Sequence, residues 1–261
     1  GLHERPLISR LNSFKDPYEL KAGMVFAAVR MSPMLGGTPA ALDAKAALAL
    51  PGVERVVSLD AMGGSTAGFA VVGKTTWHAR QGAQAVDVKW QQRAQGALDS
   101  QKIEDGLLAA LKSEKGFAFY DKGAIDDAES KAARVIEATY RAPYLAHATM
   151  EPMNCTAQFI AGALKIWAPT QVPGLARAAA AKVANVSADK VKVNVTLLGG
   201  GFGRRLEADV VAQATQIAMA LDGVPVQMVW SREQDMSHDF YRPMHVAQLS
   251  AALNEIGRAS C

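Results

Sequence analysis

A run of glycines late in the chain constrains its fold more than any other feature. Residues 191–207 read VKVNVTLLGGGFGRRLE, and the apolar residues before the glycines alternate with the period of a strand that buries one face. Residues 210–221 then carry apolar side chains at helical spacing. Residues 199–203 are therefore predicted to form a loop between a strand and a helix.

Such a loop turns sharply, accepts positive φ angles and can offer unpaired amides to an anion at the start of a helix. Arg204 and Arg205 add positive charge with the bidentate geometry that suits phosphate or carboxylate. Two familiar phosphate motifs fit poorly. A P-loop would end in Gly-Lys-Ser/Thr, and a dinucleotide fingerprint would place a small residue where Leu206 stands. A tight packing turn without a ligand remains an alternative.

Two further motifs accompany GGGFGRR, namely APYLAHATMEPMNCT at residues 142–156 and SREQDMSHDFYRP at residues 231–243. Together they resemble the molybdenum-binding subunit of the xanthine oxidase family, in the branch of the isoquinoline 1-oxidoreductase beta subunit and related aldehyde dehydrogenases. Residues 23–37, 47–59 and 68–90 resemble the α/β hammerhead domain that precedes the cofactor domain in those proteins. The resemblance covers most of the chain.

The resemblance implies an α+β fold with two separate modules. We expect an N-terminal segment and hammerhead-like domain over residues 1–92, a linker over 93–130, and a partial molybdenum-cofactor-binding domain over 131–261. Family members are several hundred residues longer. This chain is therefore expected to be a fragment, a split-gene subunit, or a chain whose last residues are foreign. The glutamate that the family uses as general base is expected outside it.

The implied activity is that of a molybdenum hydroxylase, an oxidoreductase that oxidises an N-heteroaromatic or aldehyde substrate with water-derived oxygen. In relatives a glutamine at the position of Leu145 approaches the oxo group of the metal, and a glutamate at the position of Leu206 polarises purines. Leu145 therefore removes a hydrogen-bond donor from beside the metal, while Leu206 disfavours purines as a substrate and favours an apolar pocket. The residues expected to bind the molybdenum–molybdopterin cofactor are Gly200, Gly201, Phe202, Gly203 and Arg204. The residues expected to line the substrate pocket are Phe202, Leu145 and Leu206.

The expected partners are the remaining molybdenum-binding portion or a second subunit, an iron–sulfur subunit that removes electrons, and a small-molecule substrate. The net charge of +3 comes from scattered basic residues, which disfavours nucleic-acid binding. No apolar run approaches the length of a membrane span, about 18 residues. The N-terminal sequence GLHERPLISR is too polar for a signal peptide. A bacterial periplasmic or cytoplasmic location is expected, and the resemblance slightly favours the periplasm.

Several polar residues invite other interpretations that we disfavour. His147 and Glu151 are four residues apart, but the prolines on either side, Pro143 and Pro152, disfavour the helix that a shared metal would need. No metal ligands are therefore predicted. Cys155 lacks a flanking base and is expected to be a small buried hydrophobe.

The segment from 231 to 239 is also rich in polar groups. Arg232, Glu233 and Asp235 are expected to form a solvated ion-pair cluster. His238 and Asp239 would point apart in an extended chain, so a Ser/His/Asp triad is disfavoured.

Periodicity predicts helices near residues 39–50 and from residue 75, and an amphipathic helical segment at 103–111. It also predicts a hairpin of strands at 155–160 and 163–167.

Two functions of other classes remain open. One is an independent nucleotide-binding oxidoreductase, which rests on the glycine loop alone. The other is a non-catalytic assembly or interaction subunit, which rests on the short chain and on Leu145.

Overall fold

A computed structural model describes residues 23–94, 96, 98–113 and 116–259. Residues 1–22, which include the N-terminal sequence GLHERPLISR, lie outside this part of the chain, as does Cys261. The chain divides into two compact units. The first combines residues up to 97 with residues 146–240, and the second combines residues 98–145 with residues from 241 onward.

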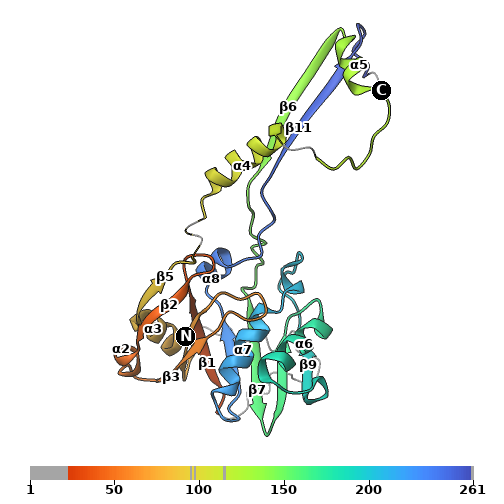
Figure 1. Cartoon of the computed structure of the whole chain (residues 1–261). Helices are drawn as coiled ribbons and strands as arrows, with labels where there is room; N and C mark the ends of the chain where they lie inside the picture. Colours follow the sequence, from red (N-terminus) through yellow and green to blue (C-terminus); the bar gives the residue numbers. More distant parts are fainter. Residues whose placement is uncertain (1–22, 95, 97, 114–115, 260–261) are drawn as a thin grey trace. The chain divides into compact units, whose positions relative to one another are not determined.

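A seven-stranded mixed sheet forms the centre of the first unit (Figure 1). In spatial order its strands are β3 (Val53–Leu59), β4 (Gly68–Gly73), β1 (Val25–Met31), β10 (Val226–Val229), β7 (Asn154–Ile160), β8 (Ala163–Ala168) and β9 (Val191–Val195). Neighbouring strands are antiparallel except for the pairs β1–β10 and β8–β9.

Helices cover both faces of this sheet. On one face, α6 (Pro173–Ala184) and α7 (Asp209–Met219) contribute to the larger apolar cluster. On the other face, a smaller cluster contains residues of α2 (Lys45–Leu48) and α3 (Thr76–Ala85). A two-stranded ribbon of β2 (Thr38–Asp43) and β5 (Asp87–Gln91) adds partly buried side chains to it. Because both faces are covered, every residue of β4 is buried.

The two modules expected from the sequence contribute strands to the same sheet. Strand β1 comes from the first expected module and β10 from the second, and they pair in parallel with Val25 opposite Val226. Val25 and Met153 also belong to one apolar cluster. Strands from the two expected modules thus form one sheet, in which the edge of β1 is buried against β10.

Local expectations held at most elements. The β7–β8 hairpin and helix α3 lie close to where the periodicity places them. The predicted helix at 39–50 is wrong, because β2 occupies its first half. Asp43 then accepts a hydrogen bond from the amide of Lys45, and only the short α2 follows. In β9, Val191 is buried, but Val195 is 50% exposed because this strand lies at the sheet edge and ends there.

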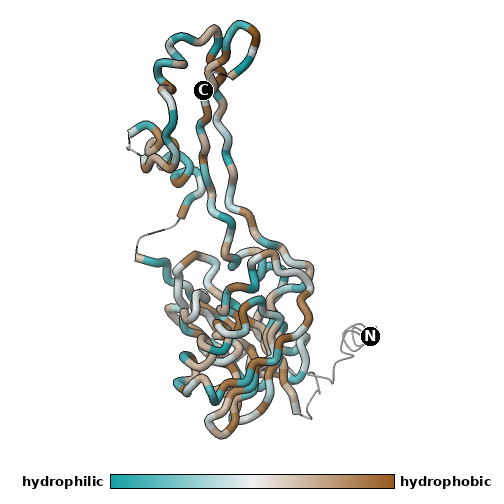
Figure 2. Tube along the Cα trace, turned by 90° about the vertical axis from the view of Figure 1, so that its right-hand side faces the viewer, coloured by the Kyte–Doolittle hydropathy of each residue, from teal (hydrophilic) through white to brown (hydrophobic). Residues whose placement is uncertain are grey.

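The second unit contains the long strands β6 (Arg134–Ala142) and β11 (His245–Leu253) and the helices α4 (Ser100–Ser113) and α5 (Ile125–Ser130). The strands pair over nine residues in an antiparallel ribbon. The expected linker at 93–130 thus carries two helices. Apolar and polar residues are interspersed along the ribbon (Figure 2), and its exposed apolar side chains are Val135, Ile136, Tyr140 and Leu249.

Across the described residues, no helix combines the length and apolar character needed to cross a membrane.

Candidate functional site

The glycine loop connects β9 to a short 3₁₀ turn, η2 (Arg204–Leu206), and α7 begins only at Asp209. The sequence predicts that the loop leads directly into the N-terminus of a helix. In the structure the 3₁₀ turn separates the two. Three of its residues have left-handed backbone conformations: Gly200 at φ +103°, Phe202 at +53° and Gly203 at +98°. Phe202 is not a glycine, so this conformation costs about 1–2 kcal/mol and marks the loop as a candidate site.

Four consecutive amides of this loop are unpaired. In the described part of the chain, the N–H groups of Gly200, Gly201, Phe202 and Gly203 donate no hydrogen bond. The loop is instead held through its carbonyls. Those of Gly201 and Gly203 accept from the amides of Arg204 and Leu206, at 2.8 and 3.1 Å. Successive free amides in left-handed and turn conformations form concavities that bind anionic oxygens.

Arg205 and Glu151 hold the start of the loop in place. The guanidinium of Arg205 is buried; its Nε donates to the carbonyl of Gly200 at 2.7 Å, and its Nη2 lies 2.8 Å from Oε2 of Glu151. The same carboxylate oxygen accepts the amide of Gly199 at 2.9 Å. The carboxylate of Glu151 thus supports the loop. It binds Arg205 and the amide of Gly199 and is not paired with His147 as a metal ligand. Among the described residues, no group of three metal-ligating side chains gathers.

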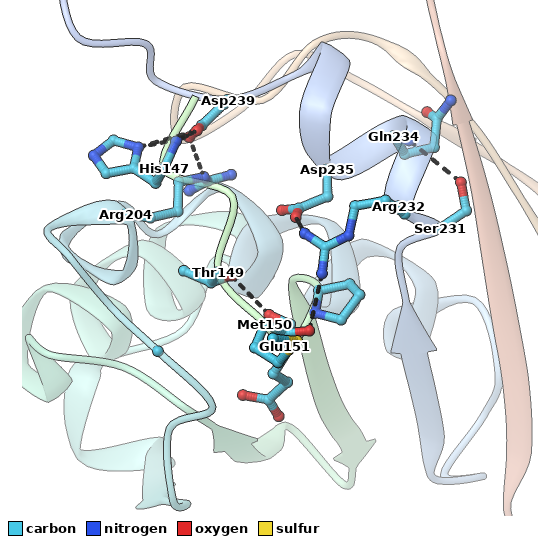
Figure 3. Close-up of polar contacts among 12 residues, drawn as sticks. His147, Thr149, Met150, Glu151, Arg204, Ser231, Arg232, Gln234, Asp235 and Asp239 are labelled. Carbon is cyan, nitrogen blue, oxygen red and sulfur yellow. Dashed lines mark hydrogen bonds and ion pairs between the residues drawn. The ribbon is translucent and has the colours of Figure 1, made fainter. Parts of the chain in front are cut away.

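Arg204 lies at the centre of a buried ionic network (Figure 3). Its side chain is 1% exposed and forms two parallel hydrogen bonds to Asp209, at 3.0 and 2.7 Å. Its Nε lies 2.9 Å from Oδ1 of Asp239. Its guanidinium also lies over the rings of Trp230 and Phe240, 5.6 and 5.2 Å from their centroids.

That Arg204 binds the cofactor directly stays a prediction, and these contacts show that its side chain already has partners within the chain. Burial alone would lower the pKa of Arg204. The hydrogen bond and charge of Asp209, with the charges of Asp239 and Asp235, outweigh burial and raise that pKa above its ordinary value. The guanidinium therefore stays charged and is committed to carboxylates of this chain. We assign Arg204 the role of fixing the end of the glycine loop against Asp239.

The polar segment that follows β10 includes α8 (Arg232–Ser237). Ser231 caps the start of this helix, because its side-chain oxygen accepts a hydrogen bond from the amide of Gln234. Arg232 and Asp235 form the expected ion pair, at 2.5 Å. The prediction that the cluster is solvated is wrong for Asp235, whose side chain is 5% exposed. Burial raises the pKa of Asp235 above its ordinary value, and the charges of Arg232 and Arg204 only partly oppose this.

This shift predicts a pH-dependent effect of Asp235→Asn. A carboxyl whose pKa is raised on folding stabilises the fold most when protonated, so its contribution declines as pH rises through the folded-state pKa. We therefore expect the free energy of unfolding of Asp235→Asn, minus that of the unsubstituted chain, to be higher at pH 7 than at pH 4. Urea denaturation at both pH values measures the difference. The exposed Asp87→Asn is the control, and a difference that does not change with pH would contradict the expectation.

The predicted pocket residues lie in both units. Phe202, within the loop, is 76% exposed, and Leu206, in the turn that follows it, is 46% exposed; both belong to the first unit. Leu145 is 58% exposed and belongs to the second unit, where its backbone pairs with Arg242. A cavity of about 390 Å³ between β1, α3 and α8 is lined by none of these three residues. Their common pocket remains a prediction.

Sequence reasoning missed the partners of Arg204. Asp209 stands five residues after Arg204, but Asp239 is distant in sequence and was considered only beside His238. Asp239 instead contacts His147: the Nδ1 atom of the imidazole lies 3.0 Å from Oδ1 of the carboxylate. The expected burial of Cys155 is confirmed, and burial raises the pKa of its thiol.

The model of the molybdopterin cofactor-binding domain matches residues 111–260. The beta subunit of isoquinoline 1-oxidoreductase from Brevundimonas diminuta is 28% identical over 89% of this chain and 30% of its own length. A membrane-bound aldehyde dehydrogenase (pyrroloquinoline-quinone) from Gluconacetobacter polyoxogenes is 28% identical over 90% of this chain and 31% of its own length. The chain therefore spans about a third of these curated relatives.

Among solved structures, quinoline 2-oxidoreductase from Pseudomonas putida 86 matches with a TM-score of 0.66 and 20% identity, over 91% of this chain and 35% of its own. The fold thus extends through both units of this chain, and the matched family model covers more than half of its residues. The resemblance read from the three motifs is confirmed. The chain belongs to the molybdopterin cofactor-binding domain family.

Proposed function

We propose that this chain is part of a molybdenum hydroxylase that oxidises an N-heteroaromatic or aldehyde substrate with water-derived oxygen. The observation that carries the proposal is the row of four unpaired amides at residues 200–203, in a chain that belongs to a cofactor-binding family. The molybdenum–molybdopterin group, when bound, supplies the oxygen-transfer chemistry and takes up the electrons.

The glycine loop fits an oxygen atom of such a group. Its amides are donors without partners, and its glycines leave the backbone bare, so an oxo group can approach closely. Gly200, Gly201 and Gly203 supply these donors, while the exposed ring of Phe202 stands beside them as an apolar wall. Arg205 and Glu151 hold the backbone so that the donors are preorganised.

The substrate class rests on apolar side chains. Leu206 and Phe202 are both exposed at the loop, and we propose that Leu145 joins them in the assembled enzyme. Leu206 offers no hydrogen bond to a purine, and the apolar side chains of all three residues suit the apolar edge of an N-heteroaromatic ring or an aldehyde. The relatives named for isoquinoline and aldehyde oxidation agree with this choice.

The proposal includes partners. We propose that an iron–sulfur subunit removes the electrons, and that the remaining molybdenum-binding portion covers the apolar side chains along the β6–β11 ribbon. An isolated two-stranded ribbon is marginally stable in water, so such a cover would stabilise it. We also propose that residues 1–92 comprise an N-terminal segment and a hammerhead-like domain, and residues 131–261 part of the cofactor domain. The proposed location is the bacterial periplasm or cytoplasm, with the periplasm slightly favoured.

The test is the cofactor content and product of the enzyme purified with its native partners. We expect molybdenum and pterin in stoichiometric amounts, and label from ¹⁸O-water in the product of isoquinoline or benzaldehyde oxidation. Bound NAD or FAD in place of molybdopterin would instead support the nucleotide-binding alternative. A complex that holds no molybdopterin on this chain would support the assembly role.

A further inference from the structure

The imidazole of His147 has one engaged nitrogen and one free nitrogen. Its Nδ1 lies 3.0 Å from both carboxylate oxygens of Asp239 (Figure 3). Nothing in the described part of the chain bonds to its Nε2. The side chain is 22% exposed, so it lies mostly within the protein with one polar atom open to a ligand.

Asp239 determines which nitrogen is free. Its side chain is 3% exposed, forms an ion pair with Arg204 and accepts the amide of Phe240 at 2.8 Å. It also accepts the backbone amide of His147 itself. A carboxylate in this environment is an acceptor, so the Nδ1–H of His147 donates to it, and the neutral ring then presents a lone pair at Nε2.

The free nitrogen lies beside the glycine loop. A Cβ atom built on Gly203 would lie 3.7 Å from Nε2 of His147, and the amide of Gly203 is among the four that have no acceptor. The imidazole acceptor therefore lies beside a residue that carries one of the free amide donors. An oxygen that carries a proton satisfies both, since it accepts from the amides and donates to Nε2.

We propose that His147 is a ligand-binding residue of the glycine-loop site, whose Nε2 accepts a hydrogen bond from a water or hydroxyl oxygen held by the loop amides. Asp239 is the positioning residue that fixes the tautomer. The proposal deepens the proposed function and rests on it. The oxygen has two possible sources with the same chemistry: the water-derived oxygen at the cofactor, or the hydroxyl of a hydrated aldehyde substrate.

The alternative is that His147 only ties its backbone segment to Asp239. His147→Asn separates the two roles, because the amide nitrogen of asparagine stands in for Nδ1 and can still donate to Asp239, while nothing replaces Nε2. His245→Asn, at an exposed residue of β11, is the matched control.

We expect His147→Asn in the assembled enzyme to keep the melting temperature and lose about threefold to tenfold in kcat/KM, the effect of one hydrogen bond. A higher KM for the aldehyde alone indicates a substrate hydroxyl. A lower kcat at unchanged KM, or a lower molybdenum content, indicates the oxygen at the cofactor. Normal kinetics and molybdenum content would overturn the proposal.

A second readout does not depend on activity or on a variant's stability. With ¹⁵N-labelled histidine rings, we expect His147 at neutral pH to show a protonated Nδ1 and a bare Nε2 in the purified chain. The Nε2 signal should shift when cofactor is present, and that of His245 should not. The opposite tautomer, or no shift in an enzyme that contains molybdopterin, overturns the role of His147 alone. An enzyme without molybdopterin overturns the proposed function first.

Discussion

Replacing Arg204 with alanine is expected to lower the free energy of unfolding by about 3–5 kcal/mol, the cost of breaking a buried ion pair from one side. The reason is that Asp209 and Asp239 are 1% and 3% exposed and would lose their shared cation. The contacts of its guanidinium with the rings of Trp230 and Phe240 would also be lost. Chemical denaturation of the purified variant measures the loss.

The matched control is Arg177→Ala, which removes an exposed arginine from α6 and should change stability by no more than about 0.5 kcal/mol. If Arg204 bound a phosphate of the cofactor instead, the chain without cofactor would keep its stability and only cofactor retention would fall. A stable Arg204→Ala chain that loses pterin would therefore restore the role that the sequence suggests for this residue.

The sequence predicted most single elements because their information is local. The Ala161-Gly162 turn between β7 and β8 is visible within a few residues, and both turn residues adopt the positive φ that the hairpin needs. The pairing of β1 with β10 has no such local signal, since Val25 and Val226 come from opposite ends of the unit's sequence. The single sheet was missed for that reason.

The candidate site divides in the same way. The exposed backbone at Gly200, Gly201 and Gly203 could be predicted, because glycine has no side chain to cover it. The burial of Arg204 could not be predicted. The local sequence does not distinguish a surface arginine that binds phosphate from a buried arginine that binds two aspartates. The contact between His147 and Asp239 depends on two segments that fold against each other across 92 residues.

Gly201→Val is expected to have the largest effect on cofactor binding. Gly201 has no positive φ, and a Cβ there would meet Oε1 of Gln171 at 2.8 Å. That atom is the end of a flexible, exposed side chain that can move aside, so the fold should survive. The branched methyls would cover the neighbouring amides. Loss of a charge-assisted hydrogen bond, about 1.5–3 kcal/mol, predicts at least about tenfold weaker retention of molybdenum and pterin.

Gly203→Val is a less informative test, because Gly203 has φ +98° and any side chain there strains the backbone as well. Gly174→Val is the better control. It adds the same side chain near the start of α6, where a Cβ would meet nothing within 4 Å. Molybdenum and pterin per folded chain, measured beside the melting temperature, separate the two roles of Gly201. If it only packs, the melting temperature falls while cofactor content per folded chain stays constant; if its amide faces the cofactor, the content falls first.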